Sequence, residues 1–302
     1  MGAGCHQGGG GEVRAGGVRM RKRGEWASII ARVREIIAEY DFPLTLRQVF
    51  YRLVAAQALD NTRSEYNQLS DHLARAREQS EIPWDSIADL TREPIAPSTW
   101  ADLGEFAETV RQSFRLDVWE RQPAYVEIWL EKQALSELFR RVCNPYAVRL
   151  MVGRGYSSAS FLFDGAGHLE GVAAAKPVRV CYFGDFDPSG LDIFRDLRER
   201  LARYGADVVC ERLALTPAQI EEHELPPAMA KRSDTRTPAF LARHGDVAVE
   251  LDALPPDLLR RMVEAAILET LDLSEFEATR AEERRLQAEL EEWADGLAGR
   301  GR

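Results

Sequence analysis

The sequence predicts a protein of the α/β class, in which a helical unit precedes a parallel sheet. Three short apolar runs, at residues 125–130, 148–152 and 178–183, are each followed by a segment with helical periodicity. This alternation of strand and helix is typical of parallel sheets that are covered on both faces. Before these runs the apolar residues recur at helical spacing, and a segment containing Pro94 and Pro97 separates the two parts.

The N-terminal part is expected to contain three helices. In residues 25–40, apolar side chains recur at i, i+3, i+4 and i+7, which is the pattern of one buried helix face. Pro43 ends this helix, and Thr45 followed by Gln48 forms a capping box that begins a second one. Thr62 opens a third. Three such helices fit a winged-helix or helix-turn-helix unit, and they fit a plain helical bundle equally well.

The later part of the chain adds helices around the expected sheet. A helical pattern at 105–116 precedes the first strand, and an amphipathic one at 255–271 follows the last. The final helix, at 274–297, is strongly charged, and we interpret its polar surface as solvated, with a partner surface as the alternative. The predicted regions are a disordered glycine-rich tail (1–17), a winged-helix-like domain (18–98), a sheet domain (99–273) and a charged C-terminal helix (274–302).

Composition and charge restrict the possible classes of function. The formal net charge of −10 argues against a protein that coats nucleic acid by bulk electrostatics, although a local basic face can still meet phosphates. No secretory leader and no apolar stretch of about 18 residues is visible, so we expect a cytoplasmic protein without a membrane anchor. The four cysteines lack the spacing of zinc ligands and are interpreted as reduced thiols. The chain also lacks a phosphate-binding loop of the ATPase type.

Two carboxylates follow the apolar strand that leads into the most distinctive turn of the chain. Asp185 and Asp187 are two residues apart, and side chains at this spacing on a strand point to the same side, so we expect them to converge. Gly184 removes a side chain from the turn, and Pro188 can begin a helix directly after it. Glu131 ends the first expected strand in the same way, at the sheet edge where ligands bind. These carboxylates predict a divalent-metal site.

Three sequence blocks together resemble a known family. Glu131-Lys132, the GRGYSS turn at 153–158 and the DFDPSG segment at 185–190 resemble motifs of the Toprim domain, in the form found in the topoisomerase VI A subunit and the meiotic double-strand-break transesterases. In that family a winged-helix domain precedes the Toprim domain, which has a Rossmann-like parallel sheet. The order of the blocks here is the same, and a weaker match follows at 250–254.

The resemblance implies an enzyme that cleaves DNA with Mg²⁺ and a tyrosine nucleophile. The family's tyrosine lies in an Arg-x-x-aromatic-Tyr block, which corresponds to the segment from Arg47 to Tyr51. A phenol with a pKa near 10 is a poor nucleophile at neutral pH, so a neighbouring guanidinium or metal is needed to favour the phenolate. The implied residues are Tyr51, Arg47 and Glu131 for catalysis, Glu131, Asp185 and Asp187 for the metal, and Lys132, Arg154, Arg75 and Arg77 for DNA binding.

Several interpretations stay open. Tyr51 either attacks DNA or packs its ring at the domain edge and hydrogen-bonds through its hydroxyl. Lys132 either holds a phosphate or forms an ordinary surface salt bridge. The leading hypothesis is cleavage by tyrosine transesterification; the alternatives are a Toprim endonuclease that uses metal-activated water, and a non-catalytic DNA-binding subunit whose carboxylates cap helices. The expected partners of this nucleoid-associated protein are double-stranded DNA, a second copy of the chain and, for a topoisomerase role, a separate ATPase subunit.

Overall fold

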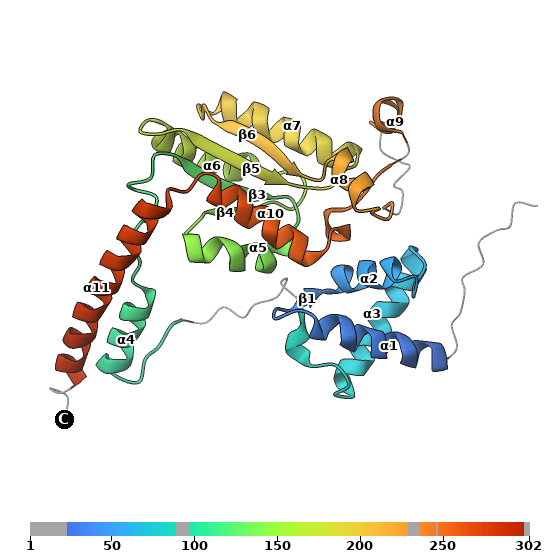
Figure 1. The fold of residues 1–302 in the computed structure, drawn as a ribbon, viewed down its shortest axis with the longest axis horizontal. Coiled ribbons are helices and arrows are strands. Elements are labelled where there is room, and N and C mark those ends of the chain that lie inside the picture. Colours follow the sequence, from blue (N-terminus) through green and yellow to red (C-terminus); the bar gives the residue numbers. More distant parts are fainter. Residues whose placement is uncertain (1–22, 89–96, 229–235, 246, 299–302) are drawn as a thin grey trace, which may run out of the picture.

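The computed structural model describes residues 23–88, 97–228, 236–245 and 247–298. The predicted glycine-rich tail and most of the predicted linker at 92–99 lie outside these residues. The described part has the α/β fold that the sequence predicts, with a helical unit beside a parallel sheet that carries helices (Figure 1). None of the helices in these ranges combines the length and apolar character that a membrane span requires.

The N-terminal unit contains the three predicted helices and two short parallel strands: α1 (Arg23–Ala38), β1 (Leu44–Thr45), α2 (Leu46–Ala55), α3 (Arg63–Glu78) and β2 (Ile87–Ala88). The capping box of α2 is confirmed, because Thr45 Oγ1 accepts a hydrogen bond from Gln48 N at 3.2 Å and Gln48 Oε1 accepts one from Thr45 N at 2.8 Å. Thr62 caps α3. The helices are compatible with both predicted arrangements, so the winged-helix assignment stays a prediction.

The sheet in the described residues has four parallel strands in the order β4, β3, β5, β6. Their bounds are Tyr125–Leu130 for β3, Leu150–Val152 for β4, Val178–Phe183 for β5 and Val209–Ala214 for β6. The three predicted strands are confirmed, although β4 begins at Leu150 rather than at residue 148. β3 and β5 pair along their whole length, with Leu130 opposite Phe183. Because both strands end at this pair, the residues that follow them meet at one edge of the sheet.

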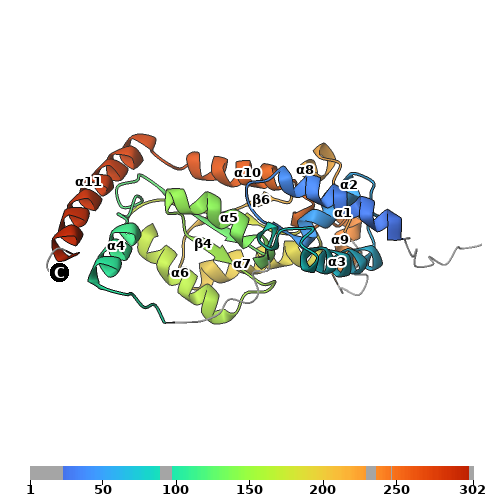
Figure 2. The same ribbon diagram turned by 90° about the horizontal axis from the view of Figure 1, so that it is seen from below.

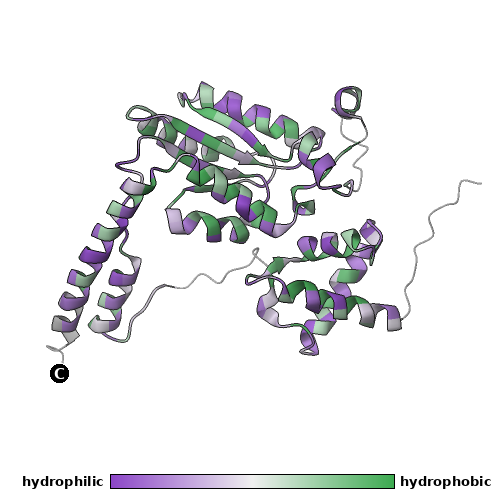
Figure 3. Cartoon of the chain, in the orientation of Figure 1, coloured by the Kyte–Doolittle hydropathy of each residue, from purple (hydrophilic) through white to green (hydrophobic). Residues whose placement is uncertain are grey.

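Helices cover both faces of this sheet. α6 (Ala159–Ala173) and α7 (Pro188–Arg203) lie on one face, while α5 (Ser136–Cys143) and α10 (Pro256–Leu268) lie on the other (Figure 2). Figure 3 shows the strands between them as mainly hydrophobic, as expected for a sheet that is buried on both sides. The shorter helices are η1 (Trp84–Ser86), η2 (Gln133–Leu135), η3 (Asn144–Tyr146), α8 (Pro217–Glu222), α9 (Thr237–His244) and η4 (Leu251–Ala253).

Helices α4 (Leu103–Ser113) and α11 (Leu273–Ala298) lie side by side, away from the sheet (Figure 1). The sequence predicts both helices, and Figure 3 shows α11 as largely hydrophilic. The two segments are joined by polar contacts, since Leu116 N donates to Glu283 Oε2 at 2.9 Å and Gln287 Nε2 donates to Phe114 O at 3.0 Å. The solvated surface expected for α11 is therefore limited to the faces that α4 leaves uncovered.

A buried carboxyl group lies in the middle of β3. The Glu127 side chain is fully buried, and Trp129 Nε1 donates to its Oε2 at 2.9 Å. The Tyr125 hydroxyl, His168 and Arg149 lie near the other oxygen, Oε1. Burial raises the pKa of Glu127 from its ordinary value of 4.5 to about 7, and Trp129, Arg149 and Tyr125 only partly oppose the rise. Between about pH 4.5 and pH 7, Glu127 is therefore protonated in the folded protein and ionised in the unfolded chain.

This proton makes the stability of the fold depend on pH. When folding raises the pKa of an acid, binding of its proton contributes to the free energy of unfolding. This contribution is fully present below the unfolded-state pKa and is lost as the pH rises through the folded-state pKa. We expect Glu127→Gln to match the wild type near pH 4 and to be more stable by about 3 kcal/mol at pH 8. Urea unfolding at both pH values measures this difference. The exposed control Glu120→Gln should show no gain, and an equal gain in both variants would contradict the assignment.

Candidate functional site

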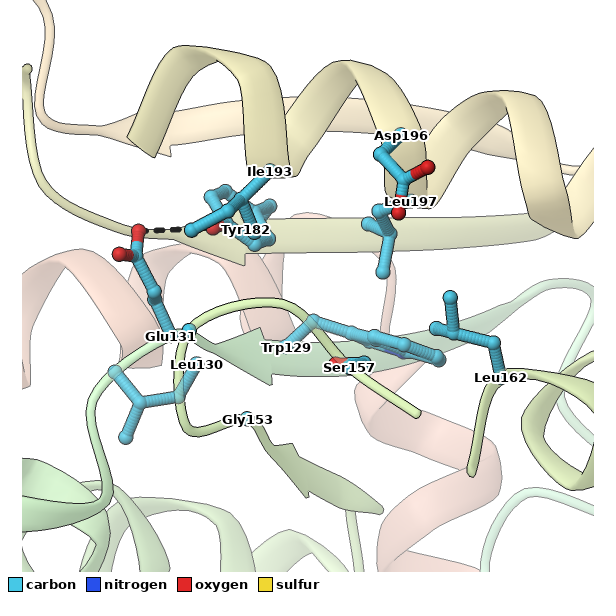
Figure 4. A pocket seen from close by; sticks show the side chains of 11 residues that line it. Trp129, Leu130, Glu131, Gly153, Ser157, Leu162, Tyr182, Ile193, Asp196 and Leu197 are labelled. Carbon is cyan, nitrogen blue, oxygen red and sulfur yellow. Dashed lines mark hydrogen bonds between the residues drawn. The ribbon is translucent and has the colours of Figure 1, made fainter. Parts of the chain in front are cut away.

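Glu131 and Asp185 lie together at the carboxyl ends of β3 and β5. Glu131 N donates to Phe183 O at 2.9 Å, and Asp185 N donates to Glu131 Oε2 at 3.1 Å. Gly184 makes this approach possible, because a Cβ at that position would overlap Glu131 Oε2. The Tyr182 hydroxyl donates to the same oxygen at 3.0 Å (Figure 4). One oxygen of the Glu131 carboxylate is therefore fixed by the fold.

Asp187 has a separate local role. Because β5 ends at Phe183, Asp185 and Asp187 lie in the turn after the strand, where the alternation of strand side chains does not explain their placement. Asp187 is the N-cap of α7, and its Oδ1 accepts a hydrogen bond from Gly190 N at 2.6 Å. Asp185 Oδ1 instead accepts a hydrogen bond from Leu251 N at 2.8 Å. Each carboxylate keeps a second oxygen that these bonds do not use.

The charges of Asp185 and Asp187 both act on Glu131. Burial raises the pKa of Glu131 above its usual range, and the charges of Asp185 and Asp187 raise it further. Burial also raises the pKa of Asp185, against the opposing effect of the Lys132 ammonium. A divalent cation would relieve this repulsion, and Mg²⁺ prefers oxygen ligands, so the donor set fits the predicted metal. Across the described ranges, no group of three or more His, Cys, Asp or Glu side chains is already arranged around an ion position.

Lys132 and Arg47 are each held by carboxylates. Lys132 Nζ lies 3.1 Å from Asp185 Oδ1, 3.0 Å from Glu250 Oε2 and 2.6 Å from Asp252 Oδ2. Glu250 also pairs with Arg47 of α2. Lys132 therefore forms the salt bridges of one predicted interpretation, but with only 16% of its side chain exposed they are not ordinary surface pairs. These contacts connect the N-terminal unit to the acidic edge of the sheet.

Tyr51 is enclosed between the N-terminal unit and η4. The residue is 1% exposed, and its hydroxyl has no hydrogen-bond partner among the described residues. The ring is covered because η4 packs on α2, where Arg52 donates to a carbonyl of η4 at 2.7 Å. The packed ring of the second interpretation is therefore present, but the hydrogen bond that it expects is not found within the described part of the chain. Burial raises the pKa of Tyr51 and Glu250 adds to the rise, while Lys132 and Arg47 oppose it.

Arg212 on β6 holds the turn that carries the two aspartates. Its side chain donates to Gly184 O at 2.9 Å, to Gly190 O at 3.2 Å, to Leu215 O at 3.0 Å and also to Asp185 O. The guanidinium satisfies backbone carbonyls on both sides of the turn and thereby fixes its course. Sequence reasoning missed this residue. The available signal was a charged side chain near the end of an apolar strand.

Glu250 and Asp252 were also given no role from the sequence. The signal for them was the weaker match at 250–254, and their partner Lys132 lies far away in the chain. Asp252 is fully buried, and its Oδ1 has no hydrogen-bond partner in the part of the chain that the structure describes. A buried carboxylate of this kind needs compensation, which Lys132 provides at Oδ2.

The arginines predicted to bind DNA lie in different places. Arg154 follows β4 in an exposed turn, and its backbone pairs with that of Lys132, so it is beside the acidic edge. Arg75 and Arg77 lie in the last turn of α3, in the N-terminal unit. Arg77 donates to the carbonyl of Trp84 at 2.8 Å and lies over its ring at 4.5 Å. Their roles in DNA binding stay predictions.

Comparisons with known proteins do not assign this chain to a family. Neither the models of known protein families nor the curated proteins contain a match. The structure supports the α/β class and the parallel sheet. The resemblance to the topoisomerase VI A subunit therefore stays a prediction from the sequence blocks.

Proposed function

We propose that this chain cleaves phosphodiester bonds in DNA with Mg²⁺ at the acidic edge of the sheet. The observation that carries the proposal is the approach of Glu131 to Asp185, in which Asp185 N donates to Glu131 Oε2 at 3.1 Å. Their repulsion, together with Asp187, supports a cation as the natural ligand of this edge. The choice of DNA as substrate rests on the sequence resemblance. The choice of phosphodiester chemistry rests on the carboxylates.

The chain's own residues supply the other parts of the reaction. Bound Mg²⁺ would neutralise the nonbridging phosphate oxygens and favour deprotonation of the attacking group. Asp185 and Asp187 would hold it while Glu131 carries a proton, and Glu131 would join them as a ligand once that proton has left. Because Tyr182 and Asp185 N fix Glu131 Oε2, a proton passing to or from the leaving oxygen would be carried on Oε1. The raised pKa of Glu131 brings this carboxyl group closer to the neutral range in which general acids and bases work.

The burial of Tyr51 favours water as the attacking group, so hydrolysis is the mechanism that the geometry supports better. A phosphodiester cannot reach a hydroxyl that is enclosed between α2 and η4. Transesterification by Tyr51 is the second candidate, supported by Lys132 and Arg47, whose charges favour the phenolate. That mechanism requires α2 to separate from η4, which breaks the bond from Arg52 and the pair between Arg47 and Glu250.

We expect Tyr51→Phe to cut DNA at close to the wild-type rate and to leave no protein attached to the product. The substitution removes the attacking oxygen of the covalent mechanism and keeps the ring in place. Mg²⁺-dependent cutting and denaturing gels of the product measure this result. Tyr66→Phe is a matched control, because both tyrosine rings pack edge-on against Phe50. A detergent-resistant DNA adduct that is lost in Tyr51→Phe alone would establish transesterification instead.

Partners follow from the proposed reaction. A cut in both strands needs two sites, so we propose that two copies of the chain act on double-stranded DNA. Strand passage would add a separate ATPase subunit. The remaining alternative, a non-catalytic DNA-binding subunit, gains support from Asp187, which does cap α7. The crowding of Glu131 with Asp185 disfavours it, since a purely structural cap needs no second buried carboxylate beside it.

A further inference from the structure

The Lys132 ammonium is surrounded by acidic side chains. Asp185, Glu250 and Asp252 each place a carboxylate oxygen within 3.1 Å of Nζ, and they come from two separate segments of the chain. All of them are largely buried, with side-chain exposures of 13%, 18% and 0%. Three converging carboxylates are the arrangement that surrounds a hard cation in proteins. In this chain the cation is the side chain of Lys132.

Two further oxygens next to this cluster lack partners. Asp252 Oδ1 is buried and accepts no hydrogen bond from any described residue. The Tyr51 hydroxyl is also buried and has no hydrogen-bond partner among the described residues. It lies within electrostatic range of Lys132, Glu250 and Asp252. Buried polar atoms without partners are uncommon in folded proteins, and a bound ion or water is one of the explanations for them, beside strain and a catalytic role. The cluster thus offers more oxygen ligands than one ammonium uses.

We propose that Asp185, Glu250 and Asp252 form a second cation position, which Lys132 Nζ fills in place of a metal ion. This inference rests on the proposed function, because it places the fixed positive charge of Lys132 beside Asp185, one of the proposed metal ligands. Lys132 then acts as a positioning residue for Asp185 and not as a phosphate ligand. The ammonium occupies the space between the carboxylates, and no group of three or more metal-binding side chains is preformed around an ion position in the part of the chain that the structure describes.

The distance between a cation and its oxygen ligands decides which metal ion can replace the ammonium. Lys132 stands 2.6 to 3.1 Å from the carboxylate oxygens, whereas Mg²⁺ binds oxygen at about 2.0 to 2.1 Å and Ca²⁺ at about 2.3 to 2.6 Å. To bind Mg²⁺, the side chains therefore need to move inward by about 0.5 to 1.1 Å once the ammonium is removed. Mn²⁺ has the same preference for carboxylates and is a convenient probe. A side chain that keeps the volume of lysine would still block the position.

The test counts Mn²⁺ ions on the full-length protein by isothermal titration calorimetry and equilibrium dialysis. Lys132→Ala should bind one more ion per chain than the wild type, because the substitution opens the position and leaves its three carboxylates. Lys132→Met is the matched control: it removes the same charge, keeps the aliphatic volume and should bind no additional ion. Adding Asp252→Asn to Lys132→Ala should abolish the extra ion. Equal stoichiometry in the wild type and Lys132→Ala would overturn the proposal.

The outcome is separable from that of the proposed function. A wild type that binds no Mn²⁺, with one ion in Lys132→Ala, supports the second position and counts against the proposed metal site. Thermal unfolding covers the case in which Lys132→Ala is poorly folded without metal. Mn²⁺ should then raise its melting temperature by more than it raises that of Lys132→Met. If Lys132→Met folds while Lys132→Ala stays unfolded in Mn²⁺, a cation does not replace the ammonium and the proposal is wrong.

Discussion

Replacing Asp187 by asparagine is expected to lower Mg²⁺-dependent DNA cleavage by at least about 100-fold while leaving the melting temperature nearly unchanged. Asparagine keeps an acceptor oxygen for Gly190 N, and the two residues are about equally good N-caps. What the substitution removes is the negative charge that would hold the cation. Initial rates of plasmid nicking, together with thermal unfolding of the same samples, measure both effects.

The choice of asparagine separates the two roles of Asp187. Alanine would also remove the cap of α7 and would cost about 0.5–2 kcal/mol of stability. A loss of cleavage in that variant would then have two explanations, the missing charge and the weakened helix. Asp102→Asn is a matched control, because Asp102 caps α4 in the same way, with Glu105 N donating to its Oδ1 at 2.9 Å. Both variants should melt like the wild type. Unchanged cleavage in Asp187→Asn would show that this aspartate is a cap and nothing more.

Arg212→Met is expected to have the largest effect on stability, a loss of about 3 kcal/mol or more, and to abolish cleavage. The guanidinium donates to four backbone carbonyls around the turn that carries Asp185, and methionine removes all four of these hydrogen bonds. Gly184 O keeps a second donor, Leu215 N at 2.8 Å. The turn would also lose the constraint that directs Asp185 toward Glu131. Urea unfolding gives the free energy, and the nicking assay gives the activity.

An exposed arginine on the neighbouring helix provides the control for this substitution. Arg195 on α7 pairs with Asp192 and Glu199, and half of its side chain is exposed. Exposed pairs of this kind contribute little to stability, so Arg195→Met should remain close to the wild type in stability and in cleavage. If Arg212→Met is equally mild, the turn is held by other contacts, and Arg212 is not needed to place the aspartates.

The sequence predicts the elements of this fold well because most of them are specified locally. The spacing of apolar residues along α1 marks a face that is buried, and Thr45 with Gln48 marks the start of α2. The apolar runs at β3 and β5 are buried strands. The meeting of Glu131 with Asp185 is also predictable, since parallel neighbouring strands end at the same edge of a sheet.

The remaining features of the site depend on contacts between distant segments. The burial of Tyr51 results from the packing of η4 on α2, and no pattern within α2 indicates that a distant segment covers this face. In the same way, Lys132 is held by Glu250 and Asp252, which are more than a hundred residues away. Helical periodicity shows which face of a helix is apolar, but it does not show which polar side chains a later segment will enclose.

The ion pairs that run from Arg47 through Glu250 and Lys132 to Asp185 have a thermodynamic consequence. Moving α2 away from η4 would strip Glu250 of one of its two cationic partners, and Lys132 would then be drawn more strongly toward Glu250 and less toward Asp185. The affinity of Asp185 for a metal ion would change with that movement. Because linkage is reciprocal, a metal ion bound at the sheet edge must alter the free energy of moving the N-terminal unit by the same amount.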